Sequence, residues 1–169
     1  KNYYQQHYFP ANTIISIVGK VPNWQRKIKE KFVFNQNQTI KKIKIKEPKL
    51  KKIKVRKEKR KIASTYLILG YKTVPRTHPD SYVLEVINGV LGRGQSGWMF
   101  EEIRGKRGLA YEVGTQHISE REYGYFAVYL SSEKKKIKLI KKLILEQLNR
   151  LKNISEKELQ EAKTCLEGS

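Results

Sequence analysis

Residues 89–114 read GVLGRGQSGWMFEEIRGKRGLAYEVG, and the interpretation of the whole chain depends on this stretch. Gly92, Gly94 and Gly97 have the Gly-x-Gly-x-x-Gly spacing of a phosphate-binding loop. A dinucleotide-binding loop needs a strand before it and a helix after it, because the pyrophosphate meets the helix N-terminus. Here the preceding residues 78–92 have helical spacing of their apolar side chains, at Leu84, Ile87, Val90 and Leu91. We therefore expect no nucleotide site. Gly92 is predicted to be the C-cap of that helix, and Gly94 and Gly97 to allow a tight reversal.

Ser96 lies in a Gly-x-Ser-x-Gly arrangement, which is also the pattern of the hydrolase nucleophile elbow. That elbow follows a strand, whereas no strand leads into Ser96, and the next position is Trp98. A serine nucleophile is therefore not expected. Ser96 is instead predicted to be the N-cap of a short helix within residues 96–108, which Gly105 and Gly108 end.

On both sides of this stretch, runs of β-branched and aromatic residues predict three strands, at 63–74, 109–118 and 122–132. The polar sequence SERE joins the last two, which predicts an antiparallel hairpin. Both faces of the first strand are largely apolar, so we expect it to lie in the centre of the sheet.

Two helices are predicted after the hairpin. Residues 133–153 carry a stripe of apolar side chains at helical spacing, namely Ile137, Ile140, Ile144, Leu148 and Leu151. Ser155 and Glu158 have the spacing of a capping box that starts the second helix. Strands and helices in this order predict an α+β fold with a mainly antiparallel sheet and helices packed on one face.

The N-terminal part has a different character. Residues 13–21, TIISIVGKV, predict a buried strand, and residues 22–34 predict a short helix. Residues 35–61 are low in complexity and basic, so we predict a solvated linker with one or two exposed strand-like pieces rather than a binding arm. Those pieces are marked by Ile43 and Ile45, and by Ile53 and Val55.

The net charge of +20 has two interpretations, binding to nucleic acid or another anionic surface, or a general compositional bias. Lysine greatly outnumbers arginine, which favours bias, and we expect no specific nucleic-acid partner. No apolar run reaches the roughly 18 residues that a membrane span needs. Cys165 is the only cysteine, which excludes an internal disulfide and any multi-cysteine zinc site.

Three motifs together carry a resemblance to a known family. HYFPANTIISIVGKV (7–21), the stretch 89–114 and ISEKELQEAKTCLEG (154–168) occur in the order of the corresponding motifs of the pitrilysin/insulinase family of zinc peptidases. That family includes the mitochondrial processing peptidase and bacterial two-domain peptidases. The resemblance implies that residues 1–34 are the closing strand and helix of a preceding homologous domain. Residues 62–169 would be most of the second, non-catalytic domain, truncated at its C-terminus. In an isolated chain the strand at 13–21 could complete the sheet of this second half.

The family's catalytic site is an inverted His-x-x-Glu-His zinc motif. This sequence has only His7, His78 and His117, none of them in such a motif, so we expect no catalytic and no metal-binding residues here. The resemblance implies that the zinc lies in a partner half, in cis or in trans.

In the family, the non-catalytic half supplies an arginine and a tyrosine, seven residues apart, that hold the substrate backbone near the zinc. Arg104 and Tyr111 match these positions. Without the resemblance, the two residues are better explained as a solvated residue at a helix end and a side chain packed in the sheet. The neighbouring loop departs from the family pattern, with Gly97 in place of the second serine and Trp98 in place of arginine.

The resemblance therefore implies a substrate-holding, non-catalytic half of a zinc metallopeptidase, whose partners are the catalytic half and a peptide substrate. A structural or assembly subunit with the same fold, and a basic nucleic-acid-binding module, remain alternatives. A homodimer is left open. The sequence does not determine the compartment, with the cytoplasm favoured over the periplasm.

Overall fold

The computed structural model describes residues 2–32 and 48–168 of the 169-residue chain. The chain divides into two compact units, Lys1–Lys44 and Ile45–Ser169, and each is described by itself. Within the described ranges, no helix is both long and apolar enough to cross a membrane.

The first unit contains helix α1 (Asn2–His7), a 3₁₀ turn at Pro10–Asn12 and helix α2 (Trp24–Lys31), which confirms the predicted helix at 22–34. The predicted buried strand at 13–21 is wrong for this structure. These residues form no strand, and Ile14 and Val18 are each 96% exposed. A strand needs a neighbour to pair its backbone N–H and C=O groups, and the described residues supply none for this segment.

Part of the basic linker falls outside the described residues, including Ile43 and Ile45. From Pro48 to Ile62 the chain has no regular secondary structure, and every residue is exposed. The predicted strand-like piece around Ile53 and Val55 is therefore absent.

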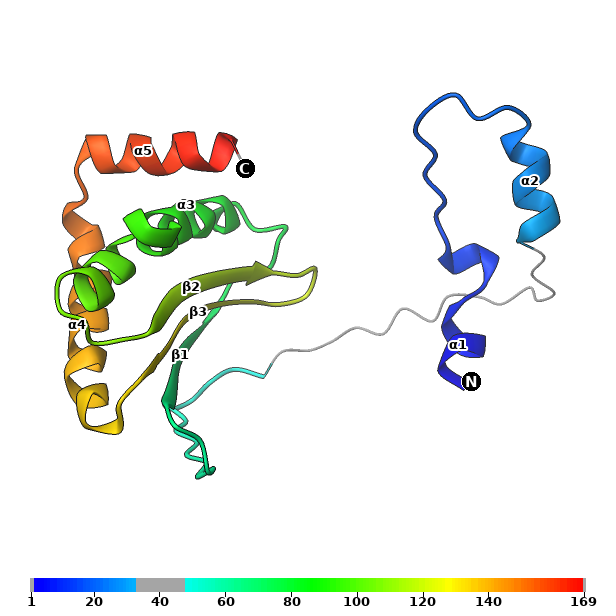
Figure 1. The fold of residues 1–169 in the computed structure, drawn as a ribbon. Helices are drawn as coiled ribbons and strands as arrows, with labels where there is room; N and C mark the ends of the chain where they lie inside the picture. Colours follow the sequence, from blue (N-terminus) through cyan, green and yellow to red (C-terminus); the bar gives the residue numbers. More distant parts are fainter. Residues whose placement is uncertain (1, 33–47, 169) are drawn as a thin grey trace. The chain divides into compact units, whose positions relative to one another are not determined.

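The sheet of the second unit consists of β1 (Thr65–Thr73), β2 (Glu112–Ser119) and β3 (Gly124–Ser132), all antiparallel, in the order β1-β3-β2 (Figure 1). The predicted hairpin is confirmed as β2 and β3. The predicted central position of the first strand is wrong, because β3 lies between the other two. Tyr66 and Ile68 on β1 are 67% and 69% exposed, so the apolar residues on this face of β1 remain in contact with solvent.

Helices cover the other face of the sheet, as Figure 1 shows. They are α3 (Asp80–Gly92), a π-helix at Phe100–Gly105 and α4 (Ile137–Arg150), whereas α5 (Glu156–Glu167) packs against α3. Short 3₁₀ turns lie at Gly94–Ser96, Lys134–Lys136 and Leu151–Asn153. The core between helices and sheet is apolar, and its most deeply buried members include Leu91, Met99, Ile103, Val128, Ile140 and Ile144. This arrangement confirms the predicted α+β class.

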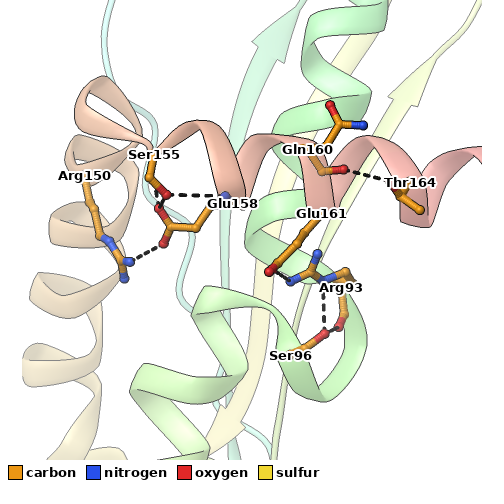
Figure 2. Close-up of polar contacts among 8 residues, drawn as sticks. All are labelled: Arg93, Ser96, Arg150, Ser155, Glu158, Gln160, Glu161 and Thr164. Carbon is orange, nitrogen blue, oxygen red and sulfur yellow. Dashed lines mark hydrogen bonds and ion pairs between the residues drawn. The ribbon is translucent and has the colours of Figure 1, made fainter.

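Helix α5 begins with the predicted capping box (Figure 2). The backbone N–H of Glu158 donates to Ser155 Oγ at 3.3 Å, and the backbone N–H of Ser155 donates to Glu158 Oε2 at 3.1 Å. Arg150 at the end of α4 donates to Glu158 Oε1 at 2.6 Å, and Arg93 donates to Glu161 at 3.3 Å. Polar contacts to α4 and to the loop after α3 therefore hold α5 in place.

Ser155→Ala is expected to lower the free energy of unfolding by about 1 kcal/mol, because it removes an N-cap acceptor. Hydrogen bonds from the Ser155 side chain and backbone, followed by Arg150, lower the pKa of Glu158 below its ordinary value of 4.5. Because the pKa of Glu158 is lowered in the folded state, its charged carboxylate stabilises the fold at pH values above 4.5. This stabilisation is lost as the pH falls through the lowered pKa. The difference between variant and wild type should therefore shrink below about pH 4. Urea unfolding at pH 7 and pH 3.5 measures it, and an equal difference at both values would contradict the role of the Glu158 charge.

Candidate substrate-contact site

The segment that leads to the candidate site, residues 96–108, differs from the prediction in its type of helix and in its N-cap. The short helix predicted within residues 96–108, with Ser96 as its N-cap, is instead a π-helix at Phe100–Gly105, whose N-cap is Met99. Its widened turn is seen in the hydrogen bond from the N–H of Lys106 to the carbonyl of Glu101, at 2.8 Å. Ser96 caps no helix. Its hydroxyl accepts from Arg93 Nε at 3.0 Å and donates to the Arg93 carbonyl at 3.1 Å (Figure 2).

The glycines before this segment serve close packing as well as turning. Gly92 is not the C-cap of α3, because the helix includes it and Arg93 takes the cap position. A Cβ on Gly92 would lie 1.9 Å from Thr115 Oγ1 of β2, so the absence of a side chain lets the helix end approach the sheet. Gly94 has a φ of +50°, the left-handed conformation that a tight reversal uses.

Arg104 lies one residue before the end of the π-helix and is exposed. Its guanidinium lies over the ring of Phe100, with 5.1 Å between Cζ and the ring centroid. Among the described residues it has no carboxylate within ion-pair distance, unlike its neighbours Lys106 and Arg107. Its hydrogen-bond donors are therefore available to a ligand.

Tyr111 lies immediately before β2, and the residue is 68% exposed. Its backbone N–H donates to the carbonyl of Ser131 at 3.0 Å, which ties the residue to the central strand. This placement differs from the alternative in which Tyr111 packs in the sheet core. Within the described part of the chain, no hydrogen bond or ring contact joins Arg104 to Tyr111, so both present polar groups to solvent independently.

Sequence reasoning missed Glu102, which precedes Arg104 by two residues in the π-helix. Its side chain is only 14% exposed, and its carboxylate pairs with Lys106 at 3.3 Å and with Arg107. The sequence does contain a signal, since a glutamate four residues before a lysine on a helix forms a favourable pair. Burial alone raises the pKa of Glu102, but the hydrogen bonds and charges of Arg107 and Lys106 outweigh burial and lower it below its ordinary value.

The histidines do not form a metal site. His78 Nδ1 accepts from the backbone N–H of Asp80 at 3.2 Å, and the buried His117 lies 3.0 Å from Glu85. Across residues 2–32 and 48–168, no three side chains of His, Cys, Asp or Glu are grouped as metal ligands. The described side chains therefore offer no ligand set for a zinc ion.

The fold and the motifs place the chain in the class of peptidase-like α+β domains. It belongs to the family described as the peptidase M16 inactive domain, whose model matches residues 1–166. This confirms the resemblance to the zinc peptidases and identifies the chain as an inactive domain of zinc-protease-like proteins.

Relatives and solved structures agree with this assignment. A Bacillus subtilis protein named "Uncharacterized zinc protease YmxG" is 29% identical over 171 residues, covering 100% of this chain and 42% of that protein. The Helicobacter pylori "Zinc protease PqqE" is 27% identical, covering 96% of this chain and 39% of its own length. The crystal structure of a peptidase M16 inactive domain from Pseudomonas fluorescens has a TM-score of 0.54 at 31% identity, covering 62% of this chain and 26% of that one. A protease from Helicobacter pylori has a TM-score of 0.61 at 25% identity, covering 65% and 27%.

The chain thus spans about two fifths of the length of these two curated relatives.

Proposed function

We propose that this chain is the substrate-holding, non-catalytic half of a zinc metallopeptidase. The observation that carries the proposal is the exposure of Arg104 and Tyr111 in an inactive peptidase domain, with Arg104 lacking an ion-pair partner among the described residues. In this proposal residues 1–34 close a preceding homologous domain, residues 35–61 are a linker, and residues 62–169 belong to the second domain. The zinc is bound by the other half, in cis or in trans.

The chemistry of the two side chains suits the role. A guanidinium offers several N–H donors to peptide carbonyls, and the phenol of Tyr111 offers one more. When a nucleophile attacks a peptide carbonyl, negative charge develops on its oxygen, and positioned donors stabilise that charge. A peptide substrate and a catalytic half bearing the zinc motif are therefore the partners of this chain.

A structural or assembly subunit is the second candidate, and one comparison favours it. A Helicobacter pylori protein named "Non-peptidase homolog YmxG" is 34% identical over 89 residues, covering 50% of this chain and 20% of that protein. In such a subunit the exposed Arg104 and Tyr111 would have no substrate to hold.

The purified chain alone is expected to hold no stoichiometric zinc and to hydrolyse no peptide, because it lacks the His-x-x-Glu-His motif. Combined with the half that carries this motif, on the same chain or as a separate protein, it should support hydrolysis of unfolded peptides. Metal analysis and a fluorogenic peptide assay measure both. About one tightly held zinc per chain would contradict the first expectation. A combined, zinc-loaded protein that hydrolyses no peptide would favour the structural subunit.

A further inference from the structure

The segment between Arg104 and Tyr111 is restrained at both ends. At its start, the N–H of Gly108 donates to the Arg104 carbonyl at 2.9 Å, and the N–H of Leu109 donates to the Ile103 carbonyl at 2.9 Å. At its end, the hydroxyl of Ser132 on β3 donates to the Leu109 carbonyl, close to the bond from Tyr111 to Ser131. The backbone therefore connects the π-helix to the sheet through one short turn.

The side chains of this turn are restrained by a single carboxylate. Lys106 and Arg107 both reach back to Glu102, where Lys106 Nζ donates to Oε2 at 3.3 Å and Arg107 Nε donates to Oε1 at 3.1 Å. An exposed pair between long side chains contributes little, but the Glu102 side chain is only 14% exposed and binds two cations at once. Removing its charge would leave both cations without this partner.

The charges of this turn also indicate a role for Glu102. Arg104, Lys106 and Arg107 are three cations within four residues, and the Glu102 carboxylate pairs with the last two. Arg104 is thereby the cation of this turn that remains for an incoming carbonyl. Without Glu102, Lys106 and Arg107 would be available to compete with Arg104 for the same acceptor.

We infer that Glu102 is a positioning residue, which fixes the turn between Arg104 and Tyr111 and keeps Lys106 and Arg107 away from the substrate. This inference rests on the proposed function. Glu102 acts through the two contact residues and touches no substrate itself.

The test uses the full-length protein with its zinc-bearing half and measures kcat and KM on a fluorogenic peptide. Glu102→Gln keeps the size of the side chain and removes the charge. We expect kcat to fall about tenfold with KM changed less than about twofold, since even a 1 Å misplacement can cost about 100-fold in rate. Glu101→Gln is the matched control. It makes the same change at the neighbouring exposed glutamate, which has no ion pair among the described residues, and should leave kcat within about twofold of wild type.

Testing Glu102→Gln in a variant that already lacks the two contact groups separates loss of positioning from a general loss of stability. In Arg104→Ala/Tyr111→Phe protein, Glu102→Gln should lower kcat no further, because the groups that it positions are gone. If Glu102→Gln lowers kcat as much in that background as in wild type, or behaves like Glu101→Gln, the inference is overturned. If Arg104→Ala and Tyr111→Phe themselves leave turnover unchanged, the proposed function fails instead.

Discussion

Arg104→Ala in the full-length protein, combined with its zinc-bearing half, is expected to lower kcat about 100- to 1000-fold. Loss of one positioned donor to a developing oxyanion typically costs about 2.7–4 kcal/mol of transition-state stabilisation. Arg104 is exposed at the end of the π-helix and has no carboxylate partner among the described residues, so its removal disturbs no ion pair of the described fold. Zinc content and the thermal unfolding midpoint should therefore remain those of wild type.

Tyr111→Phe is expected to act in the same direction, because it removes the phenolic donor and keeps the ring. Arg121→Ala is the matched control for Arg104→Ala, since Arg121 is an equally charged residue in the β2–β3 loop, with a side chain 76% exposed. The kcat of the Arg121→Ala protein should stay within about twofold of wild type, as expected for a solvated surface residue. Steady-state kinetics at matched zinc content measure kcat of these variants and of wild type. Activity of Arg104→Ala within a few-fold of wild type would exclude a substrate contact by this residue.

Gly124→Ala is expected to be the most destabilising of the substitutions considered for this fold. Gly124 is the buried first residue of the central strand β3, and an added Cβ would lie 2.1 Å from the carbonyl oxygen of Val74. That oxygen belongs to the backbone, so no side-chain rotation relieves the overlap. Overpacking typically costs about 1–3 kcal/mol, and a backbone clash in a central strand should reach at least the upper end of this range.

Gly70→Ala is the matched control for this substitution. Gly70 also lies in a strand, on the edge strand β1, but an added Cβ there would meet no atom within 4 Å. We expect stability unchanged or raised by up to about 1 kcal/mol, since alanine reduces the freedom of the unfolded chain. Urea unfolding followed by circular dichroism compares the two. Equal midpoints for Gly124→Ala and Gly70→Ala would show that the chain relaxes around the added methyl group.

Local patterns in the sequence were sufficient for most elements of the second unit. The hairpin of β2 and β3 follows from two apolar-rich segments around a short polar sequence, and α4 follows from its apolar stripe. The capping box of α5 needs only Ser155 and Glu158, because its hydrogen bonds join residues three positions apart. Arg104 and Tyr111 were found by resemblance, and the structure adds that both side chains are exposed.

Other features depended on neighbours that are distant in the sequence. The apolar run at 13–21 resembles a buried strand, yet burial requires a pairing partner that the described residues do not supply. Strand β1 is apolar on both faces, but its position at the edge follows from β3 pairing with both other strands. The spacing of Glu102 and Lys106 indicates one ion pair, but the pairing of Glu102 with Arg107 as well depends on the turn that follows the π-helix.

The sequence by itself determined the α+β class, the order of the helices and strands in the second unit, and the absence of the zinc motif, because these depend on side-chain periodicity and on residue identity along the chain. Only the tertiary structure decided which strand is central and why position 92 requires a glycine. It also decided how the turn between Arg104 and Tyr111 is restrained. The physical reason is that pairing, close approach and ion pairing depend on which surfaces meet. A one-dimensional pattern specifies the surfaces of each element but not the neighbour against which each surface packs.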